Sequence, residues 1–204
     1  MQALVQIKAA DQELLAKVDA SMAEATQRSG DWVVCRAGCT PCCFGPFAIS
    51  ALDALRLQEG LAVLDAQDPA RAEALRQRAT AYVVSIANEY PGNSKTGELW
   101  DEDALPASFD DVPCPALDVA TGLCDLYSSR PLTCRIFGAA TRMSEGGIGA
   151  CELCYDGATD EEIEACAVPV DAEDLEGKIL QSLEGAGFHG TTIVAHALLS
   201  PGAG

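Results

Sequence analysis

The chain has 204 residues, of which 49% are hydrophobic and only 5% are aromatic. This length suits one domain with a sizeable core better than two full domains. Alanine supplies much of the apolar fraction, and a β-sandwich needs more Val, Ile, Thr and aromatic residues, so we expect a mostly α fold. With 31 acidic and 13 basic residues the formal net charge is −18, a field that repels nucleic acid and anionic membrane surfaces.

We expect no secretory signal in the N-terminal residues, because they lack a continuous apolar stretch and carry Lys8, Asp11 and Glu13. No segment approaches the ~20 apolar residues that a membrane helix needs. We therefore expect a cytoplasmic protein. In that compartment thiols stay reduced, and clustered cysteines bind metal more often than they pair.

The first half of the chain contains two helix signals before residue 65. The spacing of apolar residues predicts an amphipathic helix over residues 10–28. Ser50 and Asp53 form a variant of the capping box, so they predict the start of a second helix. Gly60 can end that helix, and a short further stretch continues to Leu64.

Asp68 followed by Pro69 predicts another helix start, since an N-cap residue precedes proline at the first helical position. This helix is expected to run to about Tyr90, before Pro91. Residues 91–113 have no clear period and are predicted to form a loop.

The second half is predicted to begin with a tight turn over residues 119–123, between two short extended pieces. Arg130 and Pro131 then open a short helix. Further helices are predicted after Thr159, after Asp171 and over residues 191–199. We expect one domain over residues 1–204, with a metal-binding core at 35–138 and a helical extension at 151–204.

Cysteines are the residues that bear on function, and the ten of them fall into three groups. The groups are Cys35, Cys39, Cys42 and Cys43; Cys114, Cys124 and Cys134; and Cys151, Cys154 and Cys166. A hydrophobic core does not need such crowding, whereas thiolates converging on a soft or borderline cation explain it. We predict that all seven cysteines of the first two groups are metal ligands, with helices packed around these cysteine-bearing loops.

The spacing leaves the kind of metal centre open. Cys39 with Cys42, and Cys151 with Cys154, have the C-x2-C spacing of a zinc knuckle and could combine into one four-thiolate site. Iron–sulfur clusters also use thiolates and accept irregular spacings. Side chains of adjacent residues diverge, so Cys42 and Cys43 can both bind one centre only if the backbone is strained or the centre is a multinuclear cluster. Otherwise one of them is a ligand and the other packs in the fold.

The third cysteine group, the arginines and the histidines indicate a function less clearly. Cys151 and Cys154 are open to a redox-active or an incidental role, and Cys166 is expected in the core. The arginines of the cysteine segments (Arg36, Arg130 and Arg135) could offset thiolate charge or pair with carboxylates. His189 and His196 are expected not to be ligands. No nucleophile elbow, phosphate-binding loop, dinucleotide-binding glycine pattern or H-E-x-x-H motif is present.

The runs CRAGCTPCC and CPALDVATGLCDLYSSRPLTCRIFG resemble the YkgJ-type CxxCxxCC family, whose members are thought to chelate zinc or iron through a cysteine cluster. The matching residues are Cys39, Cys42, Cys43, Cys114, Pro115, Leu117, Gly122, Cys124, Tyr127, Arg130, Pro131, Cys134 and Arg135. Leu126 stands where isoleucine is usual, and three residues separate Cys35 from Cys39 where the family has two. The resemblance covers about residues 35–138, with the region after 140 outside it.

The resemblance implies a metal-chelating module that holds zinc or an iron–sulfur cluster. We expect Arg135 to lie beside this cofactor and to screen the thiolates. A similar cysteine pattern occurs in flagellin lysine N-methylases, which look like iron–sulfur proteins that use S-adenosylmethionine. An iron–sulfur oxidoreductase, a methyltransferase-like enzyme, and a metal carrier or sensor are therefore the alternatives to a simple metal-binding protein.

Overall fold

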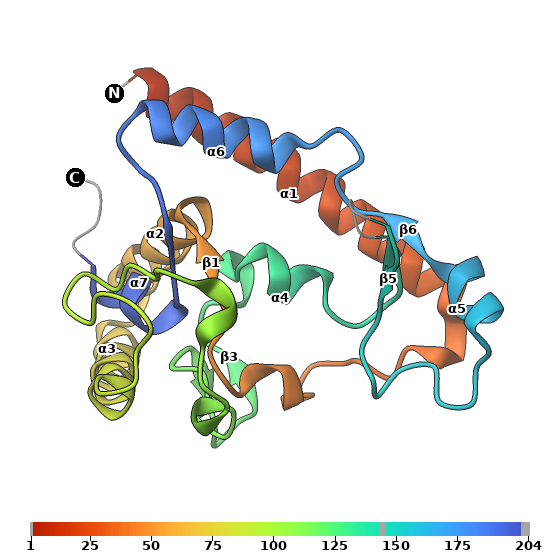
Figure 1. Cartoon of the computed structure of the whole chain (residues 1–204), viewed down its shortest axis with the longest axis horizontal. Coiled ribbons are helices and arrows are strands. Elements are labelled where there is room, and N and C mark those ends of the chain that lie inside the picture. The colour runs from red at the N-terminus through yellow and green to blue at the C-terminus, as the bar shows by residue number, and fades with distance from the viewer. Residues whose placement is uncertain (1, 143–145, 201–204) are drawn as a thin grey trace. The chain divides into compact units, whose positions relative to one another are not determined.

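The computed structural model describes residues 2–142 and 146–200, and it is mostly helical, as the composition predicts (Figure 1). Helices account for 54% of it and strands for 9%. The α-helices are α1 (Gln2–Ser29), α2 (Ala51–Gln67), α3 (Pro69–Ile86), α4 (Leu132–Ile136), α5 (Asp160–Cys166), α6 (Leu175–Gly185) and α7 (Val194–Leu199). In this part of the chain, no helix has the length and hydropathy needed to cross a membrane.

The strands are two residues each. They are β1 (Ile49–Ser50), β2 (Leu117–Asp118), β3 (Leu123–Cys124), β4 (Thr141–Arg142), β5 (Ile148–Gly149), β6 (Val168–Pro169) and β7 (Thr191–Thr192). β1 pairs with β7 and β2 with β3, both antiparallel. β4 lies between antiparallel β5 and parallel β6. Short 3-10 helices are η1 (Gly30–Trp32), η2 (Pro41–Cys43), η3 (Glu102–Ala104), η4 (Ala107–Phe109) and η5 (Tyr127–Ser129).

The chain divides into two compact units. Unit 1 comprises residues 1–36 and 132–187, and unit 2 comprises residues 37–131 and 188–204. A single domain over residues 1–204 stays a prediction. The unit boundaries fall within the segment 35–138 that was expected to form the metal-binding core, so its first two and last seven residues belong to unit 1.

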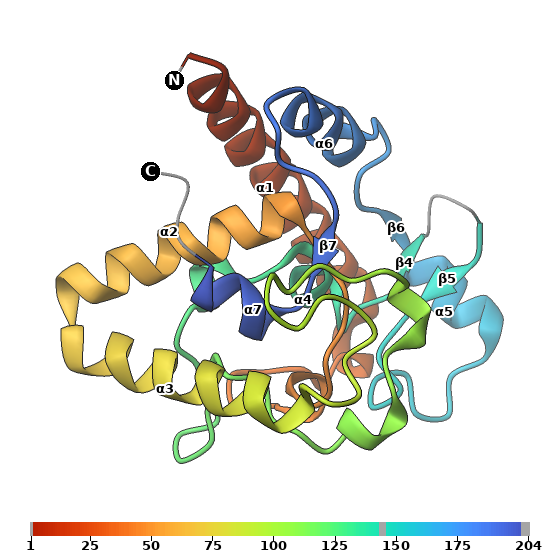
Figure 2. The same ribbon diagram turned by 60° about the vertical axis from the view of Figure 1, so that its left-hand side comes forward.

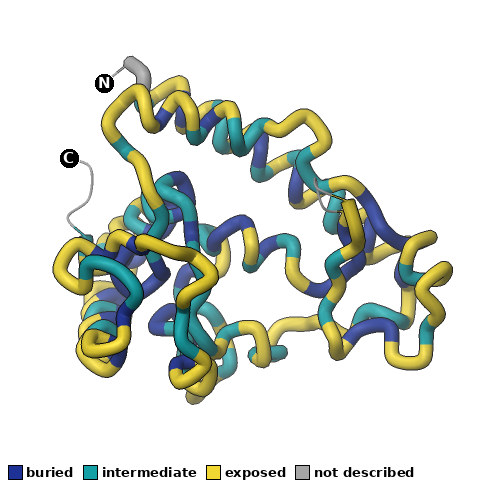
Figure 3. Tube along the Cα trace, in the orientation of Figure 1, coloured by how far each residue is buried: buried dark blue, intermediate teal, exposed yellow. Residues whose placement is uncertain are grey.

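Unit 1 is built along α1, which begins at Gln2, earlier than the predicted residue 10. Its buried positions recur at intervals of seven and four residues (Figure 3): Ile7, Leu14, Val18, Ala25 and Ser29. α6 lies alongside this helix (Figure 1). The predicted cap at Thr159 is confirmed, because Thr159 and Glu162 form a capping box on α5. α6 begins at Leu175, later than predicted, and its N-cap is Asp174, whose side chain makes no capping hydrogen bond. The Asp171 carboxylate accepts hydrogen bonds from the first two amides of α6, both at 2.9 Å.

Unit 2 is built from α2, α3 and α7, which pack against one another (Figure 2). Ser50 caps α2 by accepting a hydrogen bond from the Asp53 amide at 3.2 Å. Asp68 caps α3 in the same way through the Arg71 amide at 3.1 Å. Both starts therefore follow the prediction, since capping depends only on neighbouring residues. α3 ends at Ile86 rather than at residue 90.

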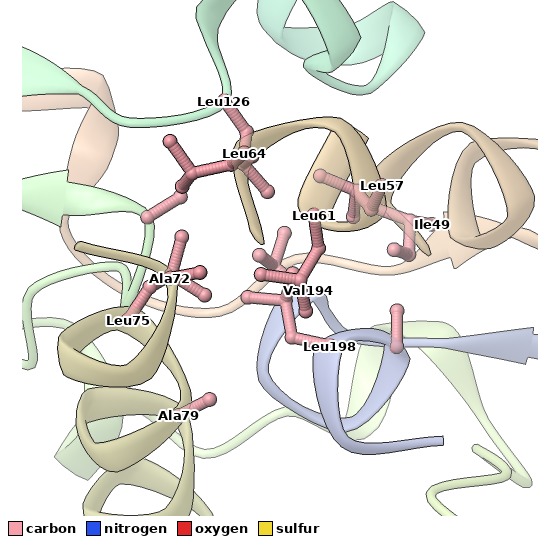
Figure 4. Close-up of a cluster of buried hydrophobic side chains, with 12 residues drawn as sticks. Ile49, Leu57, Leu61, Leu64, Ala72, Leu75, Ala79, Leu126, Val194 and Leu198 are labelled. Carbon is pink, nitrogen blue, oxygen red and sulfur yellow. The ribbon is translucent and has the colours of Figure 1, made fainter. Parts of the chain in front are cut away.

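The core of unit 2 lies where these three helices meet (Figure 4). Leu57 and Leu61 of α2, Leu75 of α3, and Val194 and Leu198 of α7 fill it. Cys114 and Cys124 pack against this cluster as partly buried residues. The core therefore supports the segments that carry these two cysteines.

Gly60 does not end α2, which runs on to Gln67. A Cβ at residue 60 would lie 2.4 Å from Ser129 Oγ and 2.5 Å from Ser129 Cβ. Glycine is thus required by the close approach of η5 and not by a helix end. The prediction that Gly60 closes the helix was wrong because the sequence does not reveal this neighbour.

Gly60→Ala is expected to destabilise the protein, although alanine favours an exposed helix over glycine by about 1 kcal/mol. Overpacking against Ser129 costs about 1–3 kcal/mol and outweighs that gain. Urea unfolding measures the difference, and the same substitution in a Ser129→Gly background is the control. If Gly60→Ala raises the free energy of unfolding in both backgrounds, the close contact with Ser129 does not affect stability.

Candidate metal centre

Five of the seven predicted ligands lie in unit 2, and two lie in unit 1. Unit 2 contains Cys39, Cys42, Cys43, Cys114 and Cys124, whereas unit 1 contains Cys35 and Cys134. All ten cysteines are thiols, and none of them forms a disulfide. The five cysteines of unit 2 are called the unit 2 cluster below.

Backbone hydrogen bonds join the segments that carry the unit 2 cluster. The Cys114 amide donates to the Cys43 carbonyl at 2.8 Å, and the Gly45 amide donates to the Val112 carbonyl at 2.9 Å. Leu117 pairs with Cys124 in the β2–β3 hairpin. Backbone hydrogen bonds therefore hold the segment of Cys43 beside the segment of Cys114, which in turn leads into the hairpin of Cys124.

The turn of this hairpin is fixed by local hydrogen bonds, as the prediction of a tight turn at 119–123 requires. The Asp118 carboxylate accepts from the Thr121 hydroxyl at 2.8 Å and from the Ala120 amide at 3.0 Å. Gly122 has a φ of +70°, which favours glycine. A Cβ added there would lie 3.6 Å from the backbone of Gly38, so the turn packs against the first cysteine loop.

Cys42 and Cys43 lie in η2, and their side chains interact. The hydrogen bond between the two side chains favours the neutral form of Cys42 and raises the pKa of its thiol well above the ordinary value. Ligation of one metal centre by both residues stays a prediction. Neither residue of this 3-10 turn has a positive φ.

Cys114 and Cys124 form a second pair of interacting thiols. Burial raises the pKa of Cys114 from 9.0 to about 12, and negative charge on Cys124 acts in the same direction. Burial also raises the pKa of Cys124. Both thiols are therefore protonated at neutral pH in the metal-free protein.

The donor set of the unit 2 cluster fits zinc or iron, because both are bound by thiolates. Over residues 2–142 and 146–200, however, no three Cys, His, Asp or Glu side chains meet in an arrangement that could hold a metal ion. The thiols lie as two pairs on hydrogen-bonded segments. Side-chain rotations would have to bring the pairs onto one centre.

Two arginines of α3, which the sequence analysis missed, hold the second pair in place. Arg71 Nε lies 2.5 Å from one oxygen of the Asp125 carboxylate, and Arg78 binds the other oxygen. Arg78 Nε also donates to the Pro115 carbonyl at 2.8 Å. The Asp125 side chain is only 1% exposed, so the carboxylate of this ion pair is shielded from solvent.

The same arginines favour the thiolate forms. Positive charge on Arg78 opposes the rise in the Cys114 pKa, and Arg71 and Arg130 do so for Cys124. Arg71 and Arg78 are seven residues apart, two turns of one helix, and Asp125 directly follows Cys124. The separation of the two arginines and the position of Asp125 beside Cys124 were the signals available in the sequence. Only the fold shows that the arginines reach the carboxylate of Asp125.

The arginines named from the sequence have other partners as well. Arg135 is buried in α4, and one of its terminal nitrogens lies 3.0 Å from the Asp19 carboxylate. Its place beside a cofactor stays a prediction. The Arg130 guanidinium lies 3.9 Å from the centre of the Tyr127 ring and donates to the Tyr127 carbonyl.

The remaining cysteines lie in unit 1, and two of them are core residues. Cys166 is buried, as expected, and its thiol donates to the Arg28 carbonyl at 3.5 Å. Cys154 is buried in the same hydrophobic cluster, with Cys151 packed against it. Cys35 packs against Gly138. His196, in unit 2, is buried beside Tyr90, and burial lowers its pKa.

Asp125→Asn is expected to lower the free energy of unfolding by about 1–3 kcal/mol, because two guanidinium groups lose their charged acceptor. Urea unfolding of the metal-free protein measures this change. Asp65→Asn is the control, since it breaks the exposed pair with Arg76 on α3 and should cost at most about 1 kcal/mol. Equal effects of the two substitutions would show that Asp125 has no special role.

The metal-free protein is expected to lose stability as the pH rises above 9, because the Cys114 pKa is about 12 in the folded chain. Above pH 9 the unfolded chain releases this proton while the folded chain retains it, so rising pH favours unfolding. Urea unfolding at several pH values measures the slope. Cys114→Ala should make the slope shallower, and an unaltered slope would contradict the assignment.

The sequence model of the CxxCxxCC family, described as a "putative zinc- or iron-chelating domain", matches residues 34–167. The match extends beyond residue 138 and includes Cys151, Cys154 and Cys166, so the expectation that the region after 140 lies outside the family was wrong. No curated protein and no solved structure matches the chain. Since the family model covers more than half of the sequence, the chain belongs to the CxxCxxCC family.

Proposed function

We propose that this protein binds zinc or an iron–sulfur cluster through the thiolates of the unit 2 cluster. The observation that carries the proposal is the set of backbone hydrogen bonds that joins the cysteine segments, above all the bond of 2.8 Å from Cys114 to Cys43. The membership of the chain in a family described by metal chelation supports it.

The two thiol pairs supply the donors of the proposed centre. Cys42 and Cys43 come from η2, and Cys114 and Cys124 come from the hairpin region. Four thiolates complete a tetrahedral zinc site or hold an iron–sulfur cluster. Cys39 precedes Cys42 by three residues in the chain. Ligation by Cys35 and Cys134, which belong to unit 1, is proposed from the sequence pattern.

Metal uptake must displace protons, because the raised pKa values keep Cys42, Cys114 and Cys124 protonated in the metal-free protein. A bound zinc ion would supply folding free energy to the loops, and an iron–sulfur cluster would in addition carry electrons. Arg71 and Arg78 offset part of the charge that the thiolates gain. The protein thus holds the segments that carry the ligands in place and offsets part of the negative charge of their thiolates.

A metal carrier is the second candidate function. Cys42 is exposed in the folded chain, and Cys39 and Cys43 are partly exposed. Exposed thiols allow a metal to pass to another ligand, whereas a fully buried site does not. We also propose a cytoplasmic location, which fits a protein with ten thiols.

The full chain, purified without oxygen, is expected to contain stoichiometric metal. Iron with acid-labile sulfide and broad visible absorption identifies a cluster, whereas colourless protein with zinc identifies a zinc site. Cys124→Ser should lower the metal content markedly, because this residue contributes one of the four donors.

Cys166→Ser is the matched control, since Cys166 is a buried thiol of unit 1 that hydrogen-bonds a backbone carbonyl. It should retain the metal content of the natural protein. Equal metal loss in the two variants, or metal-free natural protein from anaerobic cells supplied with zinc and iron, would contradict the proposal.

A further inference from the structure

Tyr82 on α3 has a hydroxyl group that is buried and has no hydrogen-bond partner among the residues that the structure describes. Its side chain is 5% exposed. The other two buried tyrosines are both paired: Tyr90 donates to the Gly97 carbonyl at 2.6 Å, and the Tyr155 hydroxyl lies 2.6 Å from the Ser29 hydroxyl. A buried hydroxyl without a partner destabilises the fold, so its presence calls for an explanation.

Tyr82 and Cys114 line the same small pocket in unit 2. Burial, and to a smaller extent negative charge on Cys114, raises the pKa of Tyr82. The two side chains therefore also interact electrostatically. The other lining residues include Pro46, Phe47 and Ile193, which have no polar side chains. The Cys114 thiol is therefore the one polar side chain that shares this pocket with the hydroxyl.

The pocket beside the Tyr82 hydroxyl is small. Its volume is about 10 Å³, the least that accommodates one water molecule. Among the side chains that line it, only the Tyr82 hydroxyl and the Cys114 thiol are polar. A protonated thiol is a weak acceptor, whereas a thiolate accepts strong, charge-assisted hydrogen bonds.

We propose that Tyr82 is a positioning residue for Cys114, and that its hydroxyl donates a hydrogen bond to the Cys114 sulfur when that sulfur is a metal-bound thiolate. This inference rests on the proposed metal-binding function. The hydrogen bond fixes the orientation of the ligand and disperses its charge, as partners of metal ligands do elsewhere. The hydroxyl has no partner among the residues that the structure describes, and a metal-bound thiolate at Cys114 would supply one.

This role predicts opposite effects of Tyr82→Phe on metal affinity and on stability. The affinity of the full chain for Co²⁺, titrated without oxygen and followed by the thiolate-to-cobalt absorption, should fall about 10- to 100-fold. The same absorption should shift to lower energy, because the sulfur loses a hydrogen bond. The denaturation midpoint of the metal-free variant should stay the same or rise, since an unpartnered buried hydroxyl is removed.

Tyr90→Phe is the matched control, because it removes a hydrogen bond that the metal-free fold already makes. It should lower the denaturation midpoint and leave the cobalt affinity within about twofold. If Tyr82→Phe binds cobalt as tightly as the natural protein, or loses affinity and metal-free stability together, the positioning role is wrong. If the natural protein itself binds neither cobalt nor zinc, the proposed function fails and this inference fails with it.

Discussion

The buried carboxylate of Asp125 joins helix α3 to the hairpin that carries Cys124. One oxygen lies 2.5 Å from Arg71, and the other binds Arg78, which also donates to the Pro115 carbonyl. Both sides of the hairpin are thereby attached to one helix, whose other face packs in the core of unit 2. In a chain with only 13 basic residues, two of them meet at this carboxylate. The position of Cys114 and Cys124 depends on this contact.

The site balances two opposing demands on its thiols. Burial favours the neutral thiol and raises the pKa of Cys114 and Cys124, so the folded chain keeps these two thiols uncharged at neutral pH. Metal ligation requires the thiolate. Arg71 and Arg78 reduce the cost of that charge, and Tyr82 is proposed to offer a hydrogen bond to it. The metal-free fold is thus prepared for a charged state that it does not itself contain.

Local features were predictable from the sequence, and long-range neighbours were not. The caps at Ser50, Asp68 and Thr159 were found because a cap depends on residues three positions apart. The mostly α fold followed from composition. Gly60 was misread because its neighbour Ser129 is 69 positions away in the chain.

The candidate site shows the same contrast between local features, which the sequence predicts, and long-range neighbours, which it does not. The cysteine spacing identified the family and the first two cysteine groups. It did not reveal the arginines of α3, the division of the predicted ligands between two units, or the interaction between the Cys42 and Cys43 side chains. These depend on tertiary packing and on a 3-10 turn, for which adjacent cysteines give no signal.

The central claim is that the metal is held by the cysteines of unit 2, and residue-specific alkylation tests it most directly. The full chain is treated with iodoacetamide with and without its metal, and each cysteine is quantified by peptide mass spectrometry. We expect the metal to protect Cys42, Cys43, Cys114 and Cys124, while the reactivity of Cys151 stays unchanged. Protection confined to the cysteines of unit 1, or equal alkylation of unit 2 with and without metal, would contradict the account.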